Sequence, residues 1–245
     1  MTAEQTEAFG YIKENLTDVR RRIAEAKKRA GRSRQITLVA VTKSASDEEL
    51  LALCALGVAD VGENRPQALA RRGQLLGAAG YFPRLHEIGN LQENKVRAIA
   101  DNVFLIHSLD RVALAEEIEK QAAKRDKTIS VLVEINSARE AQKGGVLPED
   151  ALDFCERVTG FPHLRLCGMM TMGPVLSDPE AYRPYFSLTK KLCDEAARRF
   201  CISSPVLSMG MSDSFEVAIE EGATLVRIGR RLFGKPAQIS ESNIS

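Results

Sequence analysis

The residue whose side chain most clearly suggests a chemical role stands just after a short, mostly apolar segment. Lys43 follows Ile36–Val41, a run that is rich in β-branched residues. A lysine at the end of such a segment has a buried stem, and partial desolvation would lower the pKa of its amine and make it a nucleophile toward carbonyl compounds. The same lysine could also simply extend from a strand end into water. Lys43 alone leaves both interpretations open.

Two glycine-containing turns near the end of the chain have the composition of phosphate sites. The first, Ser208–Phe215, reads as a strand end, a turn of small residues and a helix start, and the second, Val226–Arg230, follows one strand later. Exposed N–H groups at such turns bind phosphate. Each turn alone is a weak signal, since Gly210 and Ser212 could serve only as helix caps. Both turns together with Lys43 favour a phosphorylated carbonyl ligand.

Arg227 is a further residue whose side chain could take part in the site. It lies two positions before Gly229, so both residues point to the same side of their predicted strand. An arginine inside a barrel needs a partner, because burying its charge alone is costly. That partner could be a carboxylate such as Glu134 or Glu63, or it could be the ring or phosphate of a ligand.

The elements that must position these residues alternate regularly. Eight short apolar runs begin near residues 36, 58, 85, 103, 129, 164, 206 and 224, and helical patterns lie between them over 46–56, 65–77, 92–100, 110–124, 148–159, 178–199 and 213–221. A charged amphipathic helix over 4–30 precedes them. This order predicts an α/β fold, a single (β/α)8 TIM barrel with an extra N-terminal helix. An open, doubly wound parallel sheet is the alternative.

Barrel closure would bring the candidate residues together. Chemistry in TIM barrels sits at the carboxyl ends of the strands, and phosphate sites recur after strands seven and eight. The eighth strand would neighbour the first, so a ligand anchored by its phosphate at the two turns could reach Lys43.

Composition excludes several classes of function. The 245 residues carry 34 Lys and Arg against 33 Asp and Glu, a net charge of +1 that gives no electrostatic reason for nucleic acid or membrane binding. The five cysteines form no C-x-x-C pair and the three histidines are scattered, so no metal site is expected. We see neither a signal peptide nor a membrane span. We expect a cytoplasmic monomer with one ligand-binding domain over 1–235 and a flexible tail over 236–245.

Seven segments closely resemble the pyridoxal phosphate homeostasis protein family. They are Leu38–Lys43, Gly62–Asn64, His86–Lys95, His107–Arg111, Gly168–Thr171, Ser208–Asp213 and Val226–Gly234. The resemblance implies a barrel similar to the N-terminal domain of alanine racemases, with pyridoxal 5′-phosphate held as a Schiff base on Lys43. It further implies Asn64 near the ring, Arg227 near the pyridine nitrogen, and phosphate contacts from Ser212 and from the backbone of Met211, Gly229 and Arg230.

Two positions depart from the family pattern. Asn90 stands where a histidine is usual, which puts a polar role for that loop in doubt. Arg230 stands where a threonine is common, which suggests that phosphate contact at 230 comes from the main chain, with the side chain adding positive charge.

Three functions remain at this point. The expected one is a non-enzymatic carrier that buffers or delivers vitamin B6 inside the cell, with transient contacts to enzymes that use the cofactor. The alternative is an amino-acid racemase, and a weaker one is a Schiff-base aldolase acting on a sugar phosphate. Racemases with this barrel use a tyrosine from a second domain, whereas none of the four tyrosines here lies at a predicted strand end. Racemisation needs an acid and a base on opposite faces of the α-carbon, and Lys43 supplies only one.

Overall fold

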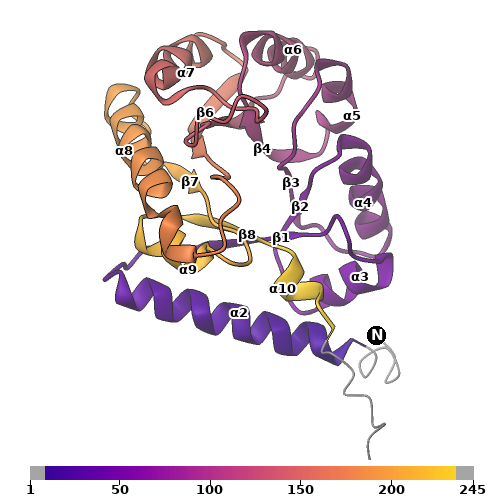
Figure 1. Ribbon diagram of the computed structural model, residues 1–245. Coiled ribbons are helices and arrows are strands. Elements are labelled where there is room, and N and C mark those ends of the chain that lie inside the picture. Colours follow the sequence, from indigo (N-terminus) through magenta and orange to yellow (C-terminus); the bar gives the residue numbers. More distant parts are fainter. Residues whose placement is uncertain (1–8, 236–245) are drawn as a thin grey trace, which may run out of the picture.

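Eight parallel strands close into a barrel in strict chain order in the computed structural model, which describes residues 9–235 (Figure 1). The strands are β1 (Thr37–Val41), β2 (Asp60–Glu63), β3 (Arg84–Glu87), β4 (Val103–Leu109), β5 (Ile129–Glu134), β6 (Leu164–Met170), β7 (Val206–Ser208) and β8 (Leu225–Ile228). β8 pairs with β1, with Ala40 opposite Ile228. The predicted TIM barrel is therefore confirmed, and the open sheet is excluded.

Helices follow the strands around the outside of the barrel (Figure 1). They are α2 (Gly10–Arg29), α3 (Asp47–Ala55), α4 (Pro66–Ala78), η1 (Glu93–Lys95), α5 (Val96–Ile99), α6 (Val112–Ala123), η2 (Pro148–Asp150), α7 (Ala151–Thr159), η3 (Pro179–Tyr182), α8 (Arg183–Arg199), α9 (Phe215–Glu220) and α10 (Arg230–Phe233). The helix expected over 92–100 is a 3-10 turn followed by one α-turn. The short helix α10 was not predicted, because its four residues cannot display a helical period.

The extra N-terminal helix is present as α2, which ends within one residue of its predicted end. Its buried side chains recur every three or four residues: Ile12, Leu16, Val19, Ile23 and Ala26. They pack α2 across α9 and α10, as Figure 1 shows. Residues 4–8 of the predicted helix and the predicted tail over 236–245 lie outside the described residues.

The barrel interior holds a small apolar layer beneath its mouth. Five buried side chains form it, namely Val39, Leu105, Leu132, Met170 and Leu225. Gly168 lets two strands approach closely here, because its φ is +145° and an added Cβ would lie 2.0 Å from the Val206 carbonyl oxygen. This part of the interior is therefore a packed core rather than a pore.

Within residues 9–235, no helix is both long and apolar enough to cross a membrane. In the same part of the chain, no three His, Cys, Asp or Glu residues come together in a group that could hold a metal ion.

Candidate functional site

Lys43 lies at the tip of a turn that is firmly held on both sides. The turn is closed by the Ala45 N–H, which donates to the Thr42 carbonyl at 3.0 Å. Buried Thr42 donates its hydroxyl to Glu63 Oε1 at 2.6 Å. From α4, Arg72 donates to the Ala45 carbonyl at 2.5 Å and pairs with Asp47. These contacts fix the backbone that carries Lys43.

The Lys43 side chain is exposed, which corrects the expectation of a partly desolvated amine. Its position follows Thr42, whose N–H still bonds the Gly62 carbonyl at 3.0 Å, so the chain leaves the barrel at Lys43. No hydrogen bond or ion pair among the described residues uses its Nζ atom. A fixed backbone with a free amine suits reaction with an incoming aldehyde, and any desolvation must come from the ligand itself.

Asn64 occupies the neighbouring strand end. Val41 pairs with Gly62, so Lys43 and Asn64 follow the carboxyl ends of two neighbouring strands. Asn64 is exposed, and its backbone packs so closely on Gly89 that an added Cβ there would lie 2.3 Å from the Asn64 carbonyl oxygen. The close packing on Gly89 holds the Asn64 backbone in place at the mouth of the barrel.

The turns after β7 and β8 are tied to each other by hydrogen bonds. The Arg227 N–H donates to the Gly210 carbonyl at 3.1 Å, and Arg231 Nε donates to the Ser212 carbonyl at 2.5 Å. Arg230 forms an ion pair with Asp213. The two turns therefore form one surface beside β1, where Gly229 packs against Val41.

This double turn has the features of an anion cradle. No hydrogen bond within residues 9–235 uses the N–H groups of Ser212, Gly229 and Arg230, whereas the Met211 N–H donates to Ser214 Oγ at 3.2 Å. Gly210 has a φ of +90°, and an added Cβ would lie 2.5 Å from that of Ala218. Only glycine fits there, and free N–H groups around such a turn favour negative charge. Of the N–H groups predicted to contact phosphate, only that of Met211 already donates a hydrogen bond among the described residues.

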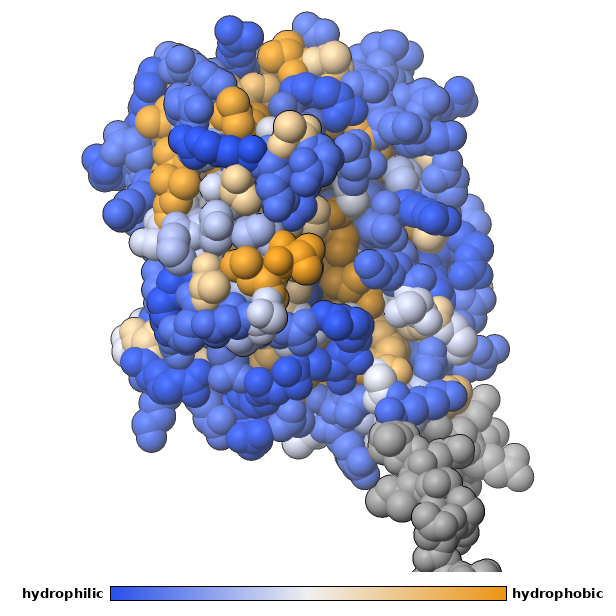
Figure 2. Space-filling model, viewed as in Figure 1, coloured by the Kyte–Doolittle hydropathy of each residue, from blue (hydrophilic) through white to orange (hydrophobic). Residues whose placement is uncertain are grey.

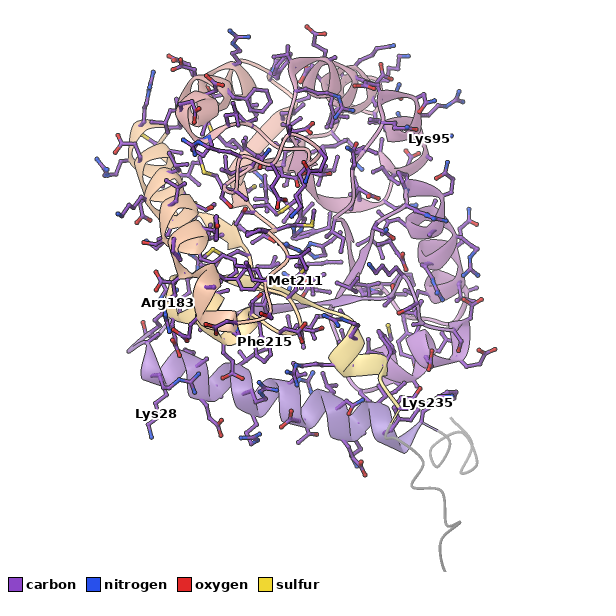
Figure 3. The ribbon with its side chains drawn as sticks, viewed as in Figure 1. Lys28, Lys95, Arg183, Met211, Phe215 and Lys235 are labelled. Atoms are coloured by element: carbon purple, nitrogen blue, oxygen red, sulfur yellow. The ribbon has the colours of Figure 1, made fainter. Side chains whose placement is uncertain are left out.

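Apolar side chains border the mouth. Met172, Val175 and Met211 are exposed large hydrophobic residues, with Met211 37% exposed. Figure 3 places Met211 near the centre of the ring of elements, and Figure 2 shows hydrophobic side chains gathered there within a hydrophilic surround. Such a border suits the apolar face of an aromatic ligand.

Arg227 is buried inside the barrel, with 3% of its surface exposed. Its Nη1 donates to Ser208 Oγ at 2.5 Å and its Nη2 donates to the Thr171 carbonyl at 3.1 Å. Burial lowers the pKa of Arg227 to about 10, and Glu134 partly opposes that shift. Neither Glu134 nor Glu63 forms an ion pair with it among the described residues, so the carboxylate partner considered from the sequence is wrong.

A set of polar side chains, two of which are histidines that lie far apart along the chain, lies directly behind Arg227. Ser208 contacts His107, His107 contacts His86, and His86 contacts Asp60. The strand pattern could have indicated them, because Asp60, His86 and His107 stand at inward-facing positions of three neighbouring strands. The scattered spacing of the histidines along the chain concealed this.

Glu87 is a buried carboxyl on the opposite, outward face of β3. Among residues 9–235, its Oε2 atom has no hydrogen-bond partner, and its Oε1 accepts only the Gly89 N–H at 3.1 Å. Burial raises the pKa of Glu87 to about 8 from an ordinary 4.5, while the Gly89 N–H opposes the shift and Glu63 adds to it. The folded protein therefore holds a proton that the unfolded chain releases between these values.

Replacing Glu87 by glutamine should remove part of the pH dependence of stability. A raised carboxyl pKa gives stability that is complete below about pH 4.5 and is lost as the pH rises toward 8. Urea unfolding gives the free energy of unfolding at pH 5 and at pH 8.5. The decrease in this free energy between the two pH values should be about 4 kcal/mol smaller in Glu87→Gln than in the parent. The control is Glu93→Gln, at an exposed carboxyl whose pKa is lowered by Arg111. Identical losses in parent and Glu87→Gln would contradict the prediction.

Comparisons with known proteins agree with this geometry. The sequence model of the alanine racemase N-terminal domain matches residues 15–236. A pyridoxal phosphate homeostasis protein of Aquifex aeolicus is 43% identical over 91% of this chain and 97% of its own length. That of Pseudomonas aeruginosa is 36% identical, over 91% and 95%.

Solved structures give the same result. PipY of Synechococcus elongatus, whose structure is known with pyridoxal phosphate bound, is 25% identical with a TM-score of 0.77, over 91% of this chain and 100% of PipY. Alanine racemase of Clostridium difficile, 15% identical, shares the fold with a TM-score of 0.72 over 94% of this chain and 61% of the racemase. This chain therefore belongs to the pyridoxal phosphate homeostasis protein family, whose barrel is that of the alanine racemase N-terminal domain.

Proposed function

We propose that this protein binds pyridoxal 5′-phosphate as a Schiff base on Lys43 and holds it for the cell's supply of the cofactor. The observation that carries the proposal is an exposed lysine on a fixed turn after β1, the strand that pairs with β8, whose following turn is joined to the turn after β7 and has N–H groups without a partner among the described residues. In forming the link, the lysine nitrogen bonds to the aldehyde carbon and the aldehyde oxygen leaves as water. When bound, the ligand supplies an electron-accepting ring.

The residues at the mouth fit each part of this ligand. Ser212 and the N–H groups of Gly229 and Arg230 are available to the phosphate, and the Met211 N–H joins them only if Ser214 releases it. Asn64 follows the strand that neighbours β1 and would face the ring. Arg227 approaches from below with its proton retained, since its pKa of about 10 keeps it charged at neutral pH. A charged arginine favours an unprotonated pyridine nitrogen.

A direct test is absorption titration of the purified protein with pyridoxal 5′-phosphate. Saturation at one ligand per chain, with a ligand absorption band that borohydride abolishes, is the expected result. A ligand spectrum that stays that of the free aldehyde would contradict covalent binding at any lysine.

The side chains present favour a carrier over a racemase. Within residues 9–235, Tyr11 is hydrogen-bonded to Glu49, and Tyr81 and Tyr185 lie in the 79–83 loop and in α8. Tyr182 is 6% exposed, stacks on Phe186 and accepts a hydrogen bond from the Leu176 N–H. None of them is free to act as the second acid or base beside Lys43.

We expect no racemase turnover on alanine or other common amino acids. A missing acid–base partner removes a factor of about 10²–10⁴ in rate, and an open mouth does not exclude water. Deuterium uptake at the α-carbon, measured with inversion by chiral chromatography, should stay far below about 1 s⁻¹. An authentic alanine racemase in the same buffer is the positive control. A rate near that of ordinary enzymes would overturn the carrier assignment.

The setting of this function is part of the proposal. The protein would act in the cytoplasm as a monomer, and transient contacts with enzymes that use pyridoxal phosphate would allow delivery. Loaded protein mixed with such an apo-enzyme should restore its activity, whereas Lys43→Ala protein treated with the ligand and desalted should not.

A further inference from the structure

A continuous line of polar side chains crosses the interior of the barrel beneath the mouth. Five residues from five strands form it: Asp60 (β2), His86 (β3), His107 (β4), Ser208 (β7) and Arg227 (β8). Asp60 Oδ1 lies 2.8 Å from His86 Nε2, and His86 Nδ1 lies 2.9 Å from His107 Nε2. His107 Nδ1 lies 3.0 Å from Ser208 Oγ, which accepts from Arg227 Nη1 at 2.5 Å. All five are at most 5% exposed.

The lower end of this line is covered by an aromatic ring and a second arginine, both of which are partly exposed. Arg84 donates to the other oxygen of Asp60 at 2.6 Å. Phe104 lies against the His86 ring with 5.4 Å between ring centroids, and Arg84 stands over Phe104 at 5.1 Å. The line therefore runs from the amino-terminal face of the barrel to the ligand-facing guanidinium without a break.

The two ends of the line carry opposite charges. Burial alone would raise the pKa of Asp60, but hydrogen bonds from His86 and Arg84 outweigh it and hold that pKa below its ordinary value. Burial lowers the pKa of His86 and lowers that of His107 strongly, with Arg227 adding to the effect on His107. At neutral pH the line consists of a carboxylate, two neutral imidazoles, a hydroxyl and a guanidinium.

These charges leave a single direction for every hydrogen bond. The carboxylate of Asp60 only accepts, so His86 must donate from Nε2 and accept at Nδ1. His107 then donates from Nε2 and accepts at Nδ1 from the Ser208 hydroxyl, whose oxygen accepts from Arg227. Reversing any one bond would leave two donors or two acceptors facing each other in a buried site.

We propose that Asp60, His86, His107 and Ser208 are positioning residues that fix the orientation of the Arg227 guanidinium, and with it the recognition of the ligand's pyridine nitrogen. The recognition of the pyridine nitrogen rests on the proposed function, whereas the orientation of Arg227 concerns the protein alone. Thr171 supplies only one main-chain acceptor to Arg227. Without Ser208, Nη1 has no partner and the guanidinium can rotate away from the mouth.

The direction of the line can be measured without ligand. Nitrogen-15 NMR of the histidine rings at pH 7 should show His86 and His107 both neutral and both protonated at Nε2. In Asp60→Asn, the amide can donate as well as accept, so mixed tautomers should appear. The Arg227 Nη protons should be resolved in the parent and averaged in Ser208→Ala. A charged histidine, or the Nδ1-protonated form of either ring in the parent, would overturn the proposal.

The effect on recognition is measured with a ligand that lacks the ring nitrogen. The parent should bind pyridoxal 5′-phosphate about tenfold more tightly than its 1-deaza analogue, a difference of about 1.4 kcal/mol. Ser208→Ala should reduce this preference to about twofold or less. Thr189→Val is the matched control, since it removes a hydroxyl that is equally buried in α8 and leaves Arg227 untouched.

The two arms separate the possible failures. A role limited to stability would lower the melting temperature of Ser208→Ala and Thr189→Val alike and leave the ligand preference of both unchanged, which would overturn the recognition clause. If the parent binds no pyridoxal 5′-phosphate, the proposed function fails. The proposed orientation of Arg227 is then tested by the NMR measurement alone, through the tautomers of His86 and His107 and the Arg227 Nη resonances.

Discussion

Replacing Lys43 by alanine should abolish covalent capture of pyridoxal 5′-phosphate. Lys43 follows β1, which pairs with the strand that leads into the second turn, and its backbone is fixed by Thr42, Ala45 and Arg72. Other lysines near the mouth are engaged, as Lys143 donates to the Gly173 carbonyl at 2.9 Å. Without Lys43 the ligand keeps only its non-covalent contacts.

The measurement is borohydride trapping followed by peptide mapping. Modification of Lys43 blocks tryptic cleavage there, and Arg65 is followed by Pro66, so the labelled peptide should span residues 35–71. Lys43→Arg keeps the positive charge but lacks a primary amine, so it should also remain unlabelled. Lys143→Ala should be labelled as the parent is. An adduct on any peptide without Lys43 would refute the assignment.

Removing the phosphate from the ligand should weaken binding at least a hundredfold. Each charge-assisted hydrogen bond contributes about 1.5–3 kcal/mol, and about 1.4 kcal/mol corresponds to a factor of ten. Ser212 and the N–H groups of Gly229 and Arg230 together provide several such bonds. The Arg230 side chain adds little, because Asp213 already neutralises it.

Parallel titrations with pyridoxal 5′-phosphate and pyridoxal check this expectation. Ser212→Ala should weaken binding of the phosphorylated form about tenfold and leave pyridoxal unaffected. Ser130→Ala, which removes a buried hydroxyl bonded to Arg165, serves as the matched control and should change neither affinity. Equal affinities for the two ligands in the parent would show that the double turn is not the phosphate site.

The sequence alone determined the barrel and predicted a candidate site at its strand ends. All eight strands begin within two residues of the start of the run that predicted them. Burial on both faces of a parallel strand imposes an unbroken apolar run, so this pattern is local and readable. Closure in chain order then pairs β1 with β8, so the strand end that precedes Lys43 lies against Gly229 at the start of the second turn.

Only the tertiary structure decided how the candidate side chains are surrounded. Lys43 is exposed where partial burial was expected, and Arg227 is held by Ser208 and a carbonyl oxygen where a carboxylate was considered. The line from Asp60 through two histidines to Arg227 joins residues up to 167 positions apart, and none of its contacts is local. Distances across a barrel depend on closure, strand register and side-chain direction together, and no spacing along the chain encodes them.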